Sequence, residues 1–123
     1  SRRLIMGAGL RDIAPREVYS AVVEKDWSSG GNSSEAYPVL AAVPGKKIVV
    51  IAFFFTQSGT TGLSFKSAST KVTGDMLTTA NSWIKGNYNP DGHFKTAVNE
   101  ALNIVPASNT GTVIGGWINY YLE

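Results

Sequence analysis

The chain has 123 residues, of which 43% are hydrophobic and 16% charged, so it fits one globular domain with a real core rather than a disordered segment. A net charge of +2 is too small to indicate nucleic-acid binding. The absence of cysteine excludes a disulfide scaffold, a cysteine zinc site and a thiol nucleophile. Ser, Thr, Asn and Gly must supply much of the polar surface, which favours β-structure.

The first fifteen residues show no sustained apolar period of 2 or 3.6. We predict an extended N-terminal arm over residues 1–15 and a single β-sandwich domain over residues 16–123. The arm's apolar stretch is too short for a secretory signal, and the longest apolar run, residues 48–55, is too short to cross a bilayer, so we expect no membrane insertion. Five consecutive arm residues are expected to bind a partner: Arg2, Arg3, Leu4, Ile5 and Met6.

Residues 17–24 fit either a helix begun near Pro15 or a strand. The strand is favoured because Val18, Val22 and Val23 are β-branched and Val18, Ser20 and Val22 alternate with their neighbours. Residues 28–34 have no apolar side chain and the composition of a flexible loop.

The rest of the chain reads as short strands separated by turn residues. Pro38 makes residues 36–40 a candidate edge strand, and residues 47–56 are apolar on both faces, which indicates a strand buried on both sides. A half-buried strand is expected at 63–67, and the sequence Asn-Pro-Asp-Gly at 89–92 indicates a tight turn. Further strands are predicted at residues 76–77, 83–84, 93–96, 102–105 and 112–122. The fold is predicted to be an all-β sandwich.

The sequence has few candidate catalytic or metal-binding residues. His93 is the one histidine, Asp91 lies in the predicted turn, and no serine has the G-x-S-x-G setting of a hydrolase nucleophile. The acidic residues and the histidine lack the spacing of a zinc or calcium site. Gly115-Gly116 has no phosphate-loop ending and instead indicates a bulge or a close backbone approach. We therefore expect no enzymatic activity, no metal and no cofactor.

Thirteen residues are aromatic, and two roles can account for them. Aromatic rings on loops can stack on sugars, which makes Trp27, Trp83 and Tyr88 candidate glycan-stacking residues. The favoured explanation is burial in the core or at a subunit interface.

Several short motifs follow one another in an order that resembles a small module of tailed-bacteriophage virion proteins. They are AAVPGKKIVV at 41–50, LSFKS at 63–67, NYNPDGHFKT at 87–96, NEALN at 99–103 and GGWINY at 115–120. The resemblance covers about two-thirds of the chain, and it departs from the family at His93, where an aromatic such as Trp is expected. Residues 1–35 lie outside it.

This resemblance implies a jelly-roll sandwich like that of tumour necrosis factor, usually trimeric and on the virion surface, without catalytic residues. We expect a homotrimeric capsid decoration protein whose arm binds the major capsid protein, another virion protein or a neighbouring subunit. The alternative is the receptor- or glycan-binding tip of a head or tail fibre. A core of this size leaves an excess of apolar residues, which predicts a trimer interface at Phe54, Trp117, Tyr120 and Tyr121.

Overall fold

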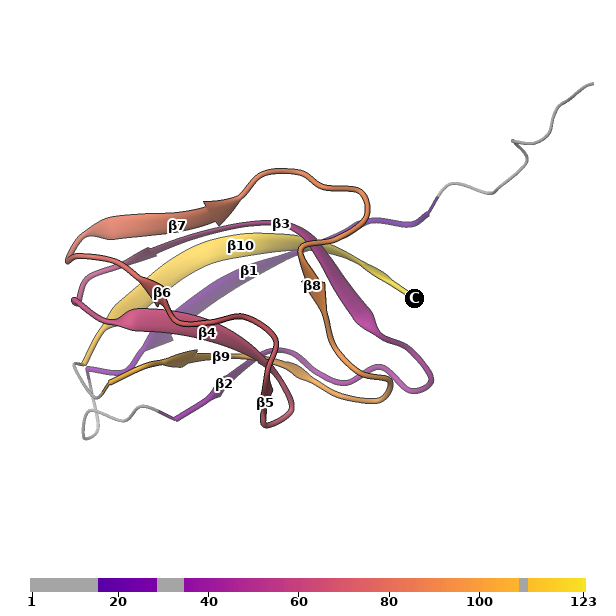
Figure 1. Ribbon diagram of the computed structural model, residues 1–123, viewed down its shortest axis with the longest axis horizontal. Helices are drawn as coiled ribbons and strands as arrows, with labels where there is room; N and C mark the ends of the chain where they lie inside the picture. Colours follow the sequence, from indigo (N-terminus) through magenta and orange to yellow (C-terminus); the bar gives the residue numbers. More distant parts are fainter. Residues whose placement is uncertain (1–15, 29–34, 109–110) are drawn as a thin grey trace, which may run out of the picture.

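The computed structural model describes residues 16–28, 35–108 and 111–123. These residues form two five-stranded antiparallel sheets stacked face to face, and no helix occurs among them (Figure 1). The predicted all-β sandwich is confirmed, while its assignment as a jelly roll remains a prediction. The predicted arm, and residues 29–34 of the predicted loop, lie outside the described residues.

Sheet A contains the two longest strands. Its order is β1 (Tyr19–Asp26), β10 (Val113–Leu122), β3 (Ile48–Gln57) and β7 (Ser82–Gly86), and the short β8 (Phe94–Lys95) also pairs with β3. Sheet B runs β2 (Tyr37–Leu40), β9 (Leu102–Pro106), β4 (Gly62–Ser67) and β5 (Thr70–Lys71), with β6 (Met76–Leu77) also on β4. Each sheet therefore joins strands from distant parts of the chain.

The core is an aromatic cluster between the sheets. Phe53 and Phe55 of β3 meet Phe65 of β4, with 5.7 Å between ring centroids in both pairs. A bulge opposite Asn119 and Tyr120 leaves Ile51 without a partner on β10. This extra residue lets Val50 face the core together with Phe53, although the two lie three positions apart.

Most predicted elements are present. Residues 36–40 form an edge strand as expected, and the turn at 89–92 is closed by the Gly92 N–H donating to the Asn89 carbonyl at 2.9 Å. The segment predicted at 17–24 is a strand shifted by two residues. Residues 63–67 are more buried than predicted, because Ser64 is fully enclosed, and β5 was not predicted.

Candidate functional site

The outer face of sheet A carries a row of large apolar side chains. Antiparallel register places Val22 of β1 opposite Trp117 of β10, and Trp117 opposite Phe54 of β3. Trp83 of the next strand, β7, stacks on the other side of Phe54. We call these four residues the apolar band. It crosses all four main strands of the sheet and faces away from the core.

The three aromatic rings of the band form a continuous ladder. Ring centroids are 6.1 Å apart for Phe54 and Trp83 and 6.4 Å apart for Phe54 and Trp117, with planes inclined by 29° and 25°. Val22 is 87% exposed, Trp83 53% and Trp117 41%. A contiguous exposed apolar patch of this kind marks an interaction surface, whereas apolar residues scattered singly do not.

A hollow lies on each side of the row of stacked rings, because the sheet carries small residues at these positions. One, of about 260 Å³, is lined by Ala52, Asn87, Tyr88 and Asn119 together with rings of the band. The other is wider, about 650 Å³, and is lined by polar residues around Gly115. The outer face thus has a ridge of stacked rings between two hollows. A protein surface of complementary shape can pack against it.

The structure separates the four residues predicted for a trimer interface. Phe54 and Trp117 lie together in the apolar band. Tyr121 lies at the end of β10, where the Arg16 guanidinium covers its ring at 4.2 Å. Tyr120 faces inward, packs against the core and stacks on Tyr19 at 5.4 Å. An interface on the outer face therefore contains Phe54 and Trp117 but not Tyr120.

The candidate glycan-stacking residues are also separated. Trp27 is 2% exposed, and its indole N–H donates to the Glu35 carbonyl at 3.0 Å. The prediction for Trp27 is wrong, because the chain after β1 turns this ring into the core. Trp83 and Tyr88 are exposed, the latter by 68%, so both can meet a ligand.

Val22 and Lys85 belong to this surface but were not singled out from the sequence. Val22 shares its face of β1 with Ser20, in keeping with the alternation from which a strand was predicted here. The Lys85 ammonium lies 5.2 Å from the centre of the Trp83 ring. Which face of an edge strand meets solvent depends on its partner strand, and no local sequence pattern specifies the partner of β1.

His93 has a structural environment. Its ring meets Phe53 edge-on at 5.7 Å, and Nε2 lies 2.5 Å from the Asn87 carbonyl oxygen. Within residues 16–28, 35–108 and 111–123, no group of His and acidic side chains is arranged to hold a metal ion. No helix of that part of the chain could span a membrane. The residues predicted to bind a partner, Arg2 to Met6, lie outside the described residues.

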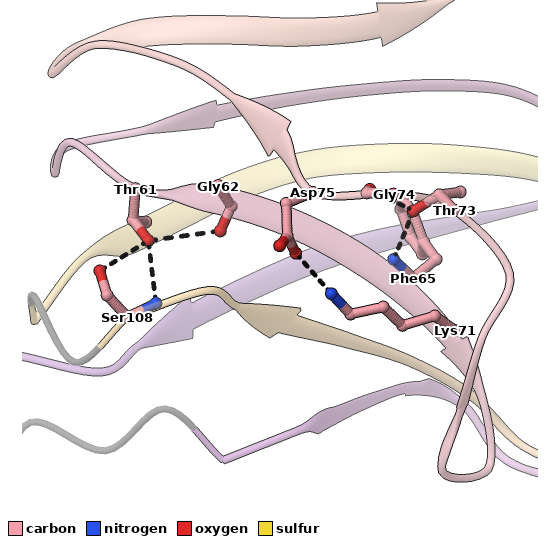
Figure 2. Close-up of polar contacts among 8 residues, drawn as sticks. All are labelled: Thr61, Gly62, Phe65, Lys71, Thr73, Gly74, Asp75 and Ser108. Atoms are coloured by element: carbon pink, nitrogen blue, oxygen red, sulfur yellow. Dashed lines mark hydrogen bonds and ion pairs between the residues drawn. The ribbon is translucent and has the colours of Figure 1, made fainter.

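Sheet B differs because several polar groups beside β4 bond to one another. Figure 2 shows Thr73 Oγ1 accepting the Phe65 N–H at 2.9 Å, and Lys71 paired with Asp75 at 3.0 Å. In the same view, Thr61 Oγ1 accepts the Ser108 N–H at 3.1 Å. Residues 70–77 thus run beside β4 and close that side of the sheet with contacts of their own.

The chain is similar to known proteins in its structure but not in its sequence. No protein-family model matches the chain, and no curated protein matches it. Among solved structures, a chain described as "Cyanophage Pam1 capsid asymmetric unit" is similar with a TM-score of 0.58 and 16% identity. The match covers 96% of this chain and 97% of that one. At this identity the likeness establishes a shared fold over nearly the whole of both chains.

Proposed function

We propose that this protein is a homotrimeric structural protein of a tailed-bacteriophage virion that decorates the capsid exterior, with no catalytic activity and no cofactor. The observation that carries the proposal is the uncovered apolar band on a sandwich whose fold matches a chain of a cyanophage capsid. The order of motifs between residues 41 and 120 supports the same assignment.

The apolar band supplies the driving force for assembly. Burying a large apolar side chain contributes about 1.5–3 kcal/mol before ordering costs, so Trp83, Phe54 and Trp117 together give a substantial term. A ridge beside a hollow suits a contact in which one copy presents the ridge and the next presents the hollow. Such head-to-tail contacts close into a ring when the rotation between copies is right, and three copies make a trimer.

The first test is the mass of the assembly. Light scattering at micromolar concentration is expected to give three copies of the 13.1 kDa chain, about 39 kDa. Trp117→Ser removes the centre of the band and is expected to shift the mass toward the monomer. Leu77→Ser is the matched control, because Leu77 is 81% exposed on sheet B and should not affect assembly. A monomeric mass for the unchanged chain contradicts the trimer.

The second test concerns the place on the virion. The protein is expected to cosediment with undecorated capsids of its own phage and to appear as symmetric density on their exterior in electron microscopy. Binding only to tails or fibres would contradict the decoration role. A chain that binds no virion component would contradict the proposal as a whole.

A second candidate function rests on exposed rings beside the smaller hollow. Trp83 and Tyr88 are accessible, and Asn87 and Asn119 line the same surface. Aromatic faces beside amide groups suit a sugar ring, so a glycan-binding fibre tip is the alternative. Binding on a glycan array that Tyr88→Ala abolishes would favour this alternative over the decoration role.

A further inference from the structure

The edges of the two sheets are protected unequally. In sheet B, β2 carries Pro38 and a shift in register, and β5 and β6 have two residues each. In sheet A, β7 has five residues, including Lys85 on its outer side. These are the usual devices that stop an edge from pairing with another chain. Among the described strands, β1 is an edge that is long and has neither a proline nor a break in register.

β1 is long and regular. Its eight residues pair with β10 without a break in register, and it contains neither proline nor a bulge. Charged residues are confined to its end, at Glu24, Lys25 and Asp26, so the first half is uncharged. An edge of this length and regularity is a template for an added strand.

Hydrogen bonding shows which backbone groups point outward. The Trp27 N–H donates to the carbonyl of Thr112, the residue opposite it, at 3.0 Å. In an antiparallel ladder such bonded pairs recur at every second residue, so the backbone N–H and C=O groups of Val23 also point to β10. Ser20, Val22 and Glu24 then direct their N–H and C=O groups to the free edge. The side chains of these three residues are exposed as well.

We propose that the free edge of β1 accepts residues 3–6 of a neighbouring copy's N-terminal arm as an added antiparallel strand. The proposal rests on the proposed function, since it needs a neighbouring subunit. The arm contributes backbone hydrogen bonds to groups that otherwise face water, the mode known as β-augmentation. A cyclic exchange of arms uses the same edge on every copy and therefore closes within a trimer.

The chemistry of the arm fits this edge. With Ile5 opposite Val22, Arg3 lies opposite Glu24, and two further apolar arm residues fall beside Val23 and Ala21. The arm holds three arginines against one aspartate, which complements the acidic end of β1. The nine residues between this segment and Arg16 can span about 30 Å when extended.

The start of the described chain favours a neighbour over the arm's own β1. Figure 1 shows the stretch before β1 continuing outward past the end of the sheet rather than turning back along it. Arg16 is held there, because its guanidinium covers Tyr121 and donates to the Pro90 carbonyl at 2.8 Å. The described chain therefore begins beside Tyr121 and Pro90 and not along the free edge of β1.

Cysteine cross-linking tests the pairing directly, because the chain has no cysteine of its own. One full-length chain carries Ile5→Cys and a second, of distinguishable mass, carries Val22→Cys. After mixing and mild oxidation, we expect the mixed disulfide to be at least tenfold more abundant than with Lys71→Cys on β5 as the second chain. The proposal is overturned if the yield of mixed disulfide is no greater than with the Lys71→Cys control. It is also overturned if a chain that carries both Ile5→Cys and Val22→Cys forms only an intramolecular disulfide.

A backbone test complements the cross-link. Val22→Pro removes an N–H that faces the free edge but not one that bonds β10, so the fold should survive while the mixed disulfide from an Arg3→Cys, Glu24→Cys pair is lost. Val22→Thr keeps the N–H and should retain it. Glu24→Pro, read out with the Ile5→Cys, Val22→Cys pair, replaces Val22→Pro if the latter does not fold. A trimeric mass without arm cross-links overturns this pairing alone, whereas a monomeric mass overturns the proposed function as well.

Discussion

The outer faces of the two sheets differ in how far the chain's own residues cover them. On sheet B, residues 70–77 run beside β4, and the polar groups there bond to one another, as Lys71 does to Asp75. On sheet A, the apolar band faces solvent and β1 has an open edge. One sheet is thus completed by its own chain, whereas the other exposes both ring surface and backbone groups that a second chain could cover.

The difference shows where this small domain places its aromatic residues. Phe53, Phe55 and Phe65 fill the space between the sheets, and a sandwich of two short layers has room for few more rings. Further rings must lie outside, and here they gather on one sheet instead of scattering over both. That segregation is what turns surplus apolar area into a single surface for assembly.

The largest effect is expected from two neighbours on β3 that face opposite ways. Phe55→Ala should lower the free energy of unfolding by about 3–5 kcal/mol, as deletion of a buried phenyl ring does, because Phe55 is fully buried. Phe54→Ala should cost clearly less in unfolding and mainly weaken assembly. Denaturant unfolding measures the first effect and light scattering the second. Equal losses in unfolding would show that the outer face is not a distinct surface.

A second pair of neighbours sharpens the contrast on β10. A Cβ at Gly116 would lie 1.9 Å from the Phe54 carbonyl oxygen and 2.8 Å from Phe55 Cα, whereas one at Gly115 meets nothing within 4 Å. Gly116→Ala should destabilise the fold by about 1–3 kcal/mol through overpacking. Gly115→Ala should leave the thermal midpoint nearly unchanged. A similar loss for both variants would contradict the close approach of β10 and β3.

A smaller effect is expected on sheet B. Lys71 and Asp75 are half-exposed, so Lys71→Met should change the free energy of unfolding by less than about 1 kcal/mol. A double-mutant cycle with Asp75→Asn isolates the pair, and added salt should reduce the coupling. Coupling that persists in molar salt would mean that the pair is not exposed as described.

The smallest effect concerns the start of β1. A hydrogen bond with Glu17 raises the pKa of the Tyr19 hydroxyl above 10.0, with desolvation and the Glu17 charge adding to it. Because the raised pKa belongs to the folded state, this contribution to stability is present below the ordinary tyrosine pKa and is lost as pH rises through the folded value. Glu17→Gln should lower the Tyr19 pKa in an NMR titration. No change at Tyr19 would refute the contact.

Several features of the candidate site were accessible from the sequence and others were not. Phe54 was predicted to meet a partner because the apolar run at 48–55 exceeds what one face can hold, and Trp117 because the end of the chain is rich in aromatic residues. Both lie on the outer face. Tyr120 and Trp27 were misplaced. Tyr120 faces inward together with Ile118, two positions before it on β10, and the turn after β1 directs Trp27 into the core. Which face of β10 is the inner one depends on its pairing with β1 and β3, and a local sequence pattern does not specify that pairing.

The sequence by itself determined the all-β class, the edge position of residues 36–40 and the turn at 89–92, because Pro, Gly and β-branched residues restrict their own backbone. Only the tertiary structure decided that β1 and β7 flank sheet A and that Val22, Trp117, Phe54 and Trp83 meet. Strand pairing joins residues nearly a hundred positions apart, as Val22 and Trp117 are, and local preferences carry no information about such partners. The physical reason is that a strand's exposed face and open edge are properties of its neighbours in the sheet.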